Sequence, residues 1–189
     1  MLSVEEIYAE LSAHMIKGIM FHEQMSNYYD FLNLHGYKRC HEYHCMAEMQ
    51  GLRKLHRYYI NHYNRLIPEK RVEDPEAIPA NWLKYSRQDV DITTRRNAVK
   101  AGVEKWVEWE TETKRLYQDM YKELMSLGEV ASANTLAECV VDVDRELKYA
   151  QRKHITLMSV DYDADYIVMV QDDLHKEYKA KTEKVGDCL

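Results

Sequence analysis

The sequence predicts an all-α protein, a four-helix bundle with a long crossover between its second and third helices and a short fifth helix. The composition is typical of a folded helical chain, because 46% of the 189 residues are hydrophobic and 31% are charged. Four long segments repeat apolar residues at spacings of three and four, as amphipathic helices do. All 3 prolines fall in one stretch between the second and third segments.

The first two helices are expected to pair. Ser3 and Glu6 form a capping-box pattern, which predicts a helix from there to about His35. Its apolar face comprises Ile7, Leu11, Gly18, Phe21, Met25, Tyr28 and Leu32. The second helix is expected from about Tyr37 to Pro68, whose ring does not fit a helix interior. Its apolar face comprises Leu52, Leu55, Tyr59 and Leu66. The short turn between them predicts an antiparallel pair.

The stretch 68–93 is expected to be a long connection that Trp82 pins to the bundle. A crossover of this length lets the third helix run parallel to the second. The third helix is expected to begin near Thr93 or Thr94. Its inner face comprises Val99, Val103, Trp106, Glu110, Thr113, Tyr117, Met120 and Leu124.

The fourth helix is expected after Gly128, and a shorter fifth helix after the bend at 161–165. The fourth should bury Leu136, Cys139, Val143, Glu146, Ala150, His154 and Leu157, and the fifth should bury Tyr166, Val170 and Leu174. These elements make one domain over 1–178, with a flexible tail at 179–189. We expect Leu11, Leu55, Trp106 and Val143 to share one core.

The charge and the hydropathy pattern limit the classes of function. The net charge of -6 argues against a protein that coats nucleic acid, which needs a basic surface. Acids follow the initial methionine where a signal peptide carries bases, and no long uninterrupted apolar segment occurs. We therefore expect a soluble, cytoplasmic protein that contacts neither nucleic acid nor membrane.

Polar residues interrupt the apolar faces of three helices. In the second helix the inner face projects back through Glu48 and His44 to Cys40 or His41, and Glu110 and Glu146 take inward positions on the third and fourth. A buried carboxylate is costly unless it is paired, protonated or bound to metal. Two interpretations remain open, a core in which these groups bond to tyrosines and a metal site. A zinc site within the Cys40–Cys45 stretch would need further ligands from another helix.

The chain resembles the ferritin-like superfamily over roughly Ser3 to Ser159. The resemblance lies in the paired helices, the long crossover and the stretch WVEWETETKRLYQDMYKEL, which is similar to the third helix of ferritins. That superfamily implies a di-metal ligand set with E-x-x-H on its second and fourth helices. Carried over, the set falls on His14, Glu48, Glu110 and Glu146, with Gly51 and Tyr149 at the histidine positions and with His44 and His154 as candidate substitute ligands. This implies an iron, manganese or zinc protein, an oxidase or a metal store.

An acidic stretch near the C-terminus suggests a different function. Five aspartates lie between Asp161 and Asp173 without a lysine or arginine. They can favour a helix start or attract a protein partner with a basic surface, anchored by interleaved tyrosines. The candidate binding residues are Asp161, Tyr162, Asp163, Asp165, Tyr166, Asp172 and Asp173. Since the metal-ligand set is incomplete, the leading interpretation is a non-catalytic, cofactor-free binding or inhibitory protein. This interpretation is compatible with a homo-oligomer.

Overall fold

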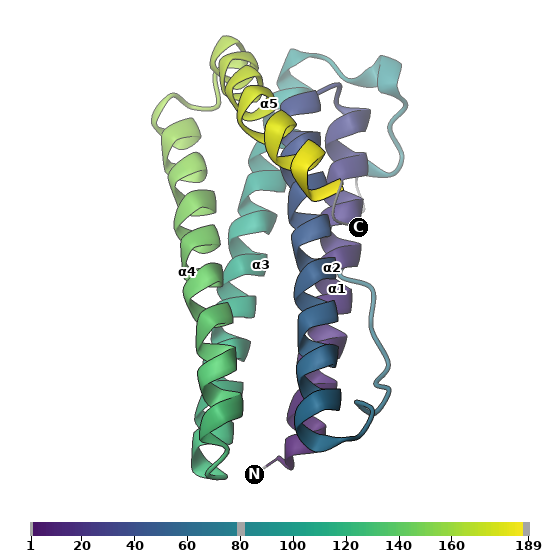
Figure 1. The fold of residues 1–189 in the computed structure, drawn as a ribbon. Coiled ribbons are helices and arrows are strands. Elements are labelled where there is room, and N and C mark those ends of the chain that lie inside the picture. Colours follow the sequence, from purple (N-terminus) through teal and green to yellow (C-terminus); the bar gives the residue numbers. More distant parts are fainter. Residues whose placement is uncertain (1, 79–81, 187–189) are drawn as a thin grey trace.

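The computed structural model describes residues 2–78 and 82–186. In this part of the chain the helices are α1 (Val4–Phe31), α2 (His35–Tyr63), the 3-10 helix η2 (Arg87–Asp89), α3 (Ile92–Ser126), α4 (Val130–Ser159) and α5 (Ala164–Gly186). The first four α-helices form the expected bundle, and α5 crosses one end of it (Figure 1). No helix of the described chain has both the length and the apolar character to cross a membrane.

The helices alternate in direction within each pair. α1 and α2 are antiparallel, the connection then returns along the outside of the bundle, and α3 runs parallel to α2 (Figure 1). Trp82 is 8% exposed and its ring meets that of Tyr28 edge-on at 6.2 Å. The predicted crossover and its attachment through Trp82 are thus confirmed.

The helix ends follow local chemistry. The Ser3 side chain accepts a hydrogen bond from the Glu6 amide at 3.2 Å, and the Glu6 carboxylate accepts one from the Ser3 amide at 2.7 Å. The second helix stops at Tyr63, earlier than expected, because Asn64 takes a left-handed conformation with φ 53. This end turns Leu66 out of the helix, where it is 79% exposed, so its predicted inward position is wrong.

The predicted inner faces of α1 and α3 are buried at every position. On α4 the apolar positions Leu136, Val143, Ala150 and Leu157 are buried, whereas Cys139, Glu146 and His154 are half-buried. On α5, Val170 and Leu174 are buried and Tyr166 is half-buried. This helix also continues through much of the segment expected to be a tail, and residues 187–189 lie outside the described chain.

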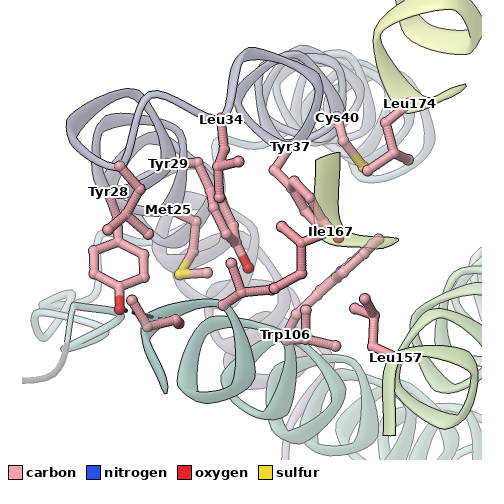
Figure 2. Close-up of a cluster of buried hydrophobic side chains, with 14 of the residues drawn as sticks. Met25, Tyr28, Tyr29, Leu34, Tyr37, Cys40, Trp106, Leu157, Ile167 and Leu174 are labelled. Carbon is pink, nitrogen blue, oxygen red and sulfur yellow. Dashed lines mark hydrogen bonds between the residues drawn. The ribbon is translucent and has the colours of Figure 1, made fainter. Parts of the chain in front are cut away.

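The buried apolar side chains form two clusters, so the expected single core is wrong. Trp106 belongs to the cluster under α5, with Tyr29, Tyr37 and Ile167 (Figure 2). The other cluster contains Leu11, Leu55 and Val143 and fills the opposite half of the bundle. Polar side chains lie between them along the helices, at His44, Glu48, Glu110, Thr113 and Glu146. We call these five residues the polar belt.

Candidate functional site

The polar belt brings side chains of α2, α3 and α4 to the middle of the bundle. Each occupies an inward position of its helix, since the helical repeat continues through it from one apolar cluster to the other. The carboxyl groups of Glu48, Glu110 and Glu146 affect one another electrostatically. Whether the three carboxyl groups share one ligand stays a prediction.

Glu110 and Thr113 are the most deeply buried members of the belt, each with 1% exposure. Glu110 Oε1 accepts a hydrogen bond from Trp106 Nε1 at 2.9 Å and lies 3.9 Å from His22 Nε2. Burial, followed by the negative charge of Glu146, raises the pKa of Glu110 to about 8. The carboxyl group of Glu110 is therefore mainly protonated near neutral pH. A cation placed beside it would favour the ionised form.

Glu48 packs against α1 where that helix has no side chain. A Cβ added to Gly18 would lie 3.2 Å from Glu48 Cδ and 3.3 Å from the ring of Trp109. Burial first, and then the charge of Glu146, raise the pKa of Glu48 to about 8. Gly18 therefore lets α1 approach a carboxyl group that would otherwise need more space.

His44 is the positive counterpart of the belt. Its Nδ1 lies 3.5 Å from Glu146 Oε1. Burial alone would lower the pKa of His44, but hydrogen bonds with Cys40 and Glu146 outweigh burial and raise the pKa well above its ordinary value. Its Nε2 is buried and has no hydrogen-bond partner among the described residues. One imidazolium therefore faces several carboxyl groups.

Two further buried histidines lie beside His44. His22 Nδ1 and His41 Nδ1 are 3.0 Å apart, so one ring donates to the other. Burial, followed by neighbouring histidines, holds the pKa of both well below the ordinary value. These rings remain neutral near pH 7, so they add no positive charge beside the carboxyl groups of the belt.

His14, carried over as the metal ligand of the first helix, has other partners. Its Nε2 is 2.9 Å from Thr113 Oγ1, and its ring stacks on Trp109 with centroids 4.7 Å apart. Burial, with the charge of Lys17 as a second cause, lowers the pKa of His14 to about 4. The ring thus joins α1 to α3 by hydrogen bonding and stacking.

A cavity of about 650 Å³ lies beside the belt, between α2 and α4. α1 packs along α2 and α3 along α4, whereas α2 and α4 make few backbone contacts. Belt members His44, Glu48, Thr113 and Glu146 line the cavity, and its apolar walls comprise Leu11, Met15, Leu55, Leu124, Leu136 and Val143. Residues of α5 complete one end, namely Glu177, Tyr178 and Lys181. This volume lies within the range of small-molecule sites.

The belt does not fit a di-metal centre. In residues 2–78 and 82–186, no group of three or more histidine, cysteine, aspartate or glutamate side chains is arranged to hold a metal ion. Gly51 and Tyr149, at the positions of the two superfamily histidines, both line the cavity instead. Gly51 supplies no ligand atom, and the Tyr149 hydroxyl donates to Glu177 at 2.9 Å.

Several residues of the acidic stretch have structural contacts. Tyr162 is 5% exposed and its hydroxyl is 2.9 Å from His154 Nδ1. Asp163 caps α5, accepting from the amides of Asp165 and Tyr166 at 3.0 and 3.1 Å. Arg96 donates to the Asp161 carboxylate at 3.0 Å.

The remaining members of the stretch lie along α5. Asp165, Asp172 and Asp173 are exposed, and Tyr166 is half-buried. Asp165 and Tyr166 join the Asp163 cap through their backbone amides, and the Asp172 carboxylate accepts from Gln171 Nε2 at 2.9 Å. The exposed carboxylates of the three aspartates remain candidates for the predicted partner surface.

Sequence reasoning missed the aromatic end of the cavity. Tyr43, Tyr149 and Tyr178 line it together with Lys181. The count of 15 tyrosines was a signal, but Tyr178 and Lys181 fell at the edge of the presumed tail. Only the path of α5 brings them to the cavity.

The comparisons with known proteins support the fold. No family model matches the chain, and no curated protein matches its sequence. A "humanized archaeal ferritin" superposes with a TM-score of 0.75 at 15% identity, covering 92% of this chain and 97% of that one. An open-pore ferritin of Archaeoglobus fulgidus gives a TM-score of 0.73 at 16% identity, with 92% and 98% covered. An engineered closed form of that ferritin gives 0.73 at 17%, with 92% and 96% covered. The chain has a ferritin-like four-helix bundle fold.

Proposed function

We propose that the protein is a non-catalytic binding protein that takes up a small organic cation in the cavity between α2 and α4. The observation that carries this proposal is the polar belt, which places several carboxyl groups beside a cavity without the side chains for a di-metal centre. A large cavity with a few convergent polar groups is the favoured place for a ligand.

The electrostatics of the belt favour a positively charged ligand. The pKa values of Glu48 and Glu110 are raised to about 8 by burial and by the charge of Glu146. A cation near Glu48 and Glu146 would stabilise the ionised carboxylates, which burial disfavours. The apolar walls at Leu55 and Val143 would cover the hydrocarbon part of the ligand.

An organic cation can supply a positive charge beside the buried carboxylates with fewer protein ligands than a metal ion needs. An ammonium group brings its own hydrogen-bond donors and needs only one or two carboxylates and an apolar wall. A metal pair needs several coordinating side chains from the protein, and Gly51 and Tyr149 do not supply the superfamily's imidazoles. The ferritin-like metal protein therefore ranks below a ligand-binding bundle.

Calorimetric titration with n-pentylamine at pH 8 tests this function. Binding should be measurable for the native chain, weakened at least about tenfold in Glu48→Gln, and unchanged in the matched control Glu112→Gln, because Glu112 is exposed on α3. Parallel titrations with Mn²⁺, Zn²⁺ and Fe²⁺ under anaerobic conditions test the alternative. Stoichiometric metal binding that is lost in Glu110→Ala, with no amine binding, would replace this proposal by the metal protein.

A protein partner with a basic surface is the second candidate. α5 exposes Asp165, Asp172 and Asp173 together with two apolar side chains, Val168 at 45% and Met169 at 49% exposure. Exposed apolar residues among like charges are typical of recognition surfaces. A second copy of the chain is one such partner, and sedimentation of the native chain across a range of concentrations tests it.

A further inference from the structure

Three tyrosine rings from different helices gather at the α5 end of the cavity. Tyr43 of α2 and Tyr178 of α5 have centroids 5.4 Å apart, and Tyr149 of α4 lies 6.2 Å from Tyr178. The ring of Tyr178 also lies 6.0 Å from that of His44, so this end of the cavity adjoins the polar belt. We call Tyr43, Tyr149, Tyr178 and Glu177 the aromatic cage.

Ammonium groups already lie at this cage, with Lys153 Nζ 5.2 Å from the centroid of Tyr149 and Lys181 at the other two rings. Lys181 Nζ lies 4.4 Å from the centroid of Tyr178 and 5.7 Å from that of Tyr43. It also donates to Glu177 Oε1 at 2.8 Å, while Glu177 Oε2 accepts from Tyr149 at 2.9 Å. Aromatic faces and a carboxylate around a cation are the recognised environment of alkylammonium groups. Lys181, a butylammonium on a backbone, shows what the cage accepts.

We infer that the ligand of the cavity is a short linear diamine, with one ammonium at Glu48 and Glu146 and the other in the aromatic cage in place of Lys181. This inference rests on the proposed function and adds a second recognition point to it. Lys181 then acts as a tethered competitor that the ligand displaces. Because Lys181 is exposed, its side chain can move into solvent without disturbing the core.

The helical repeat sets the length of the ligand. Tyr149 follows Glu146 by three residues on α4, about 4.5 Å along the helix axis, and Tyr43 precedes Glu48 by five residues on α2, about 7.5 Å. A chain of about four or five methylene groups spans this range. Longer diamines would have to fold within the cavity, and monoamines would leave the cage to Lys181.

The experiment compares 1,5-diaminopentane with n-pentylamine by calorimetry at pH 8. In Lys181→Gln, the diamine should bind about three- to tenfold more tightly than to the native chain, because one cation–π competitor is removed. The affinity for n-pentylamine should not change, since its single ammonium binds at the belt. The matched control Lys176→Gln, an exposed position of α5 outside the cage, should leave both affinities unchanged.

A second variant tests the cage itself. Tyr178→Leu should weaken diamine binding more strongly than n-pentylamine binding, with thermal unfolding checking that the chain still folds. Equal affinities for the two amines in the native chain, and no gain in Lys181→Gln, would overturn the cage while leaving the proposed function standing. Failure of both amines to bind the native chain would overturn the proposed function and the cage together.

Discussion

The seam between α1 and α3 is closed by aromatic rings, whereas α2 and α4 stand apart around carboxyl groups. In the closed seam, Trp109 stacks on Phe21 with centroids 4.9 Å apart and on His14 at 4.7 Å. The Tyr28 hydroxyl donates to the Ala98 carbonyl at 3.1 Å. In the open seam, His44, Glu48 and Glu146 line the cavity.

The difference shows that helical periodicity brings a side chain inward without deciding what it meets there. Both seams follow the same repeat, and the residues on it decide the packing. Flat rings fill the closed seam at van der Waals contact. Carboxyl groups whose pKa values are raised by burial and mutual repulsion cannot close the other seam in the same way. The open seam is therefore the side that can admit a ligand.

The largest expected effect is the loss of Trp109. Trp109→Ala should lower the free energy of unfolding by about 3–5 kcal/mol, because it removes the ring on which His14 and Phe21 stack. Leu55→Ala in the open seam should cost about 2 kcal/mol, the low end for a buried leucine, since Leu55 already borders a cavity. Urea unfolding of both variants measures the contrast. A larger loss for Leu55 would mean that the open seam carries the stability.

Gly102 and Gly51 test how much room for a side chain each seam leaves, since Gly102 lies in the closed seam and Gly51 borders the cavity. A Cβ at Gly102 would lie 2.5 Å from the Tyr29 hydroxyl oxygen and 3.2 Å from the Tyr28 ring, whereas at Gly51 the nearest atom, in Met15, is 4.0 Å away. Gly102→Ala should therefore destabilise by about 1–2 kcal/mol. Gly51→Ala should stabilise by about 0.5–1 kcal/mol, since alanine favours the helix. Thermal unfolding compares them, and the same sign for both would contradict the difference between the seams.

The carboxyl groups of the belt predict a pH dependence. The folded-state pKa of Glu110, about 8, exceeds its unfolded value, so its contribution to stability is present below the unfolded pKa and is lost as pH rises through 8. Between pH 6.5 and about 8 the free energy of unfolding should fall with a slope of up to about 1.4 kcal/mol per pH unit for each such group, and the slope should level off above pH 8. Glu110→Gln keeps an acceptor for Trp106 and should flatten this slope.

The pH window matters because the histidines with lowered pKa values, His14, His22 and His41, affect the pH dependence of stability in the opposite direction. The lowered pKa of His14, about 4, means that stability is lost as pH falls below the unfolded value. Measurements above pH 6.5 therefore avoid the titration of His14, whereas His44, whose pKa is raised, contributes with the same sign as the carboxyl groups. The comparison with Glu110→Gln isolates Glu110. Equal slopes for the native chain and Glu110→Gln would show that Glu110 titrates normally.

The smallest expected effect concerns the exposed aspartates of α5. The triple variant in which Asn replaces Asp165, Asp172 and Asp173 should associate roughly three-fold more slowly with a lysine-rich probe protein at low salt. The effect should be smaller at physiological salt, because salt screens the charges. Asp161→Asn should instead act on stability, since that carboxylate is paired with Arg96. Surface plasmon resonance at two salt concentrations measures the rates. An unchanged association rate would remove α5 from the candidate interfaces.

The sequence by itself determined the helices and their inner faces. A run such as Val99, Val103, Trp106 and Glu110 has one solution as a buried helical stripe, because side chains three and four residues apart share a face. The crossover followed from the clustered prolines, and the inward position of Glu110 followed from the same repeat. The periodicity does not predict the left-handed conformation of Asn64, and this conformation affects only where the second helix ends.

Tertiary structure alone decided which faces meet and what lies between them. Periodicity cannot tell whether His14 faces the other candidate ligands or stacks on Trp109, because both positions are inward. Nor can it show that α5 brings Tyr178 and Lys181 beside Tyr43, since these contacts join residues more than a hundred positions apart. The cavity lies where two helix pairs, each closely packed within itself, meet through aromatic rings between α1 and α3 but make few backbone contacts between α2 and α4.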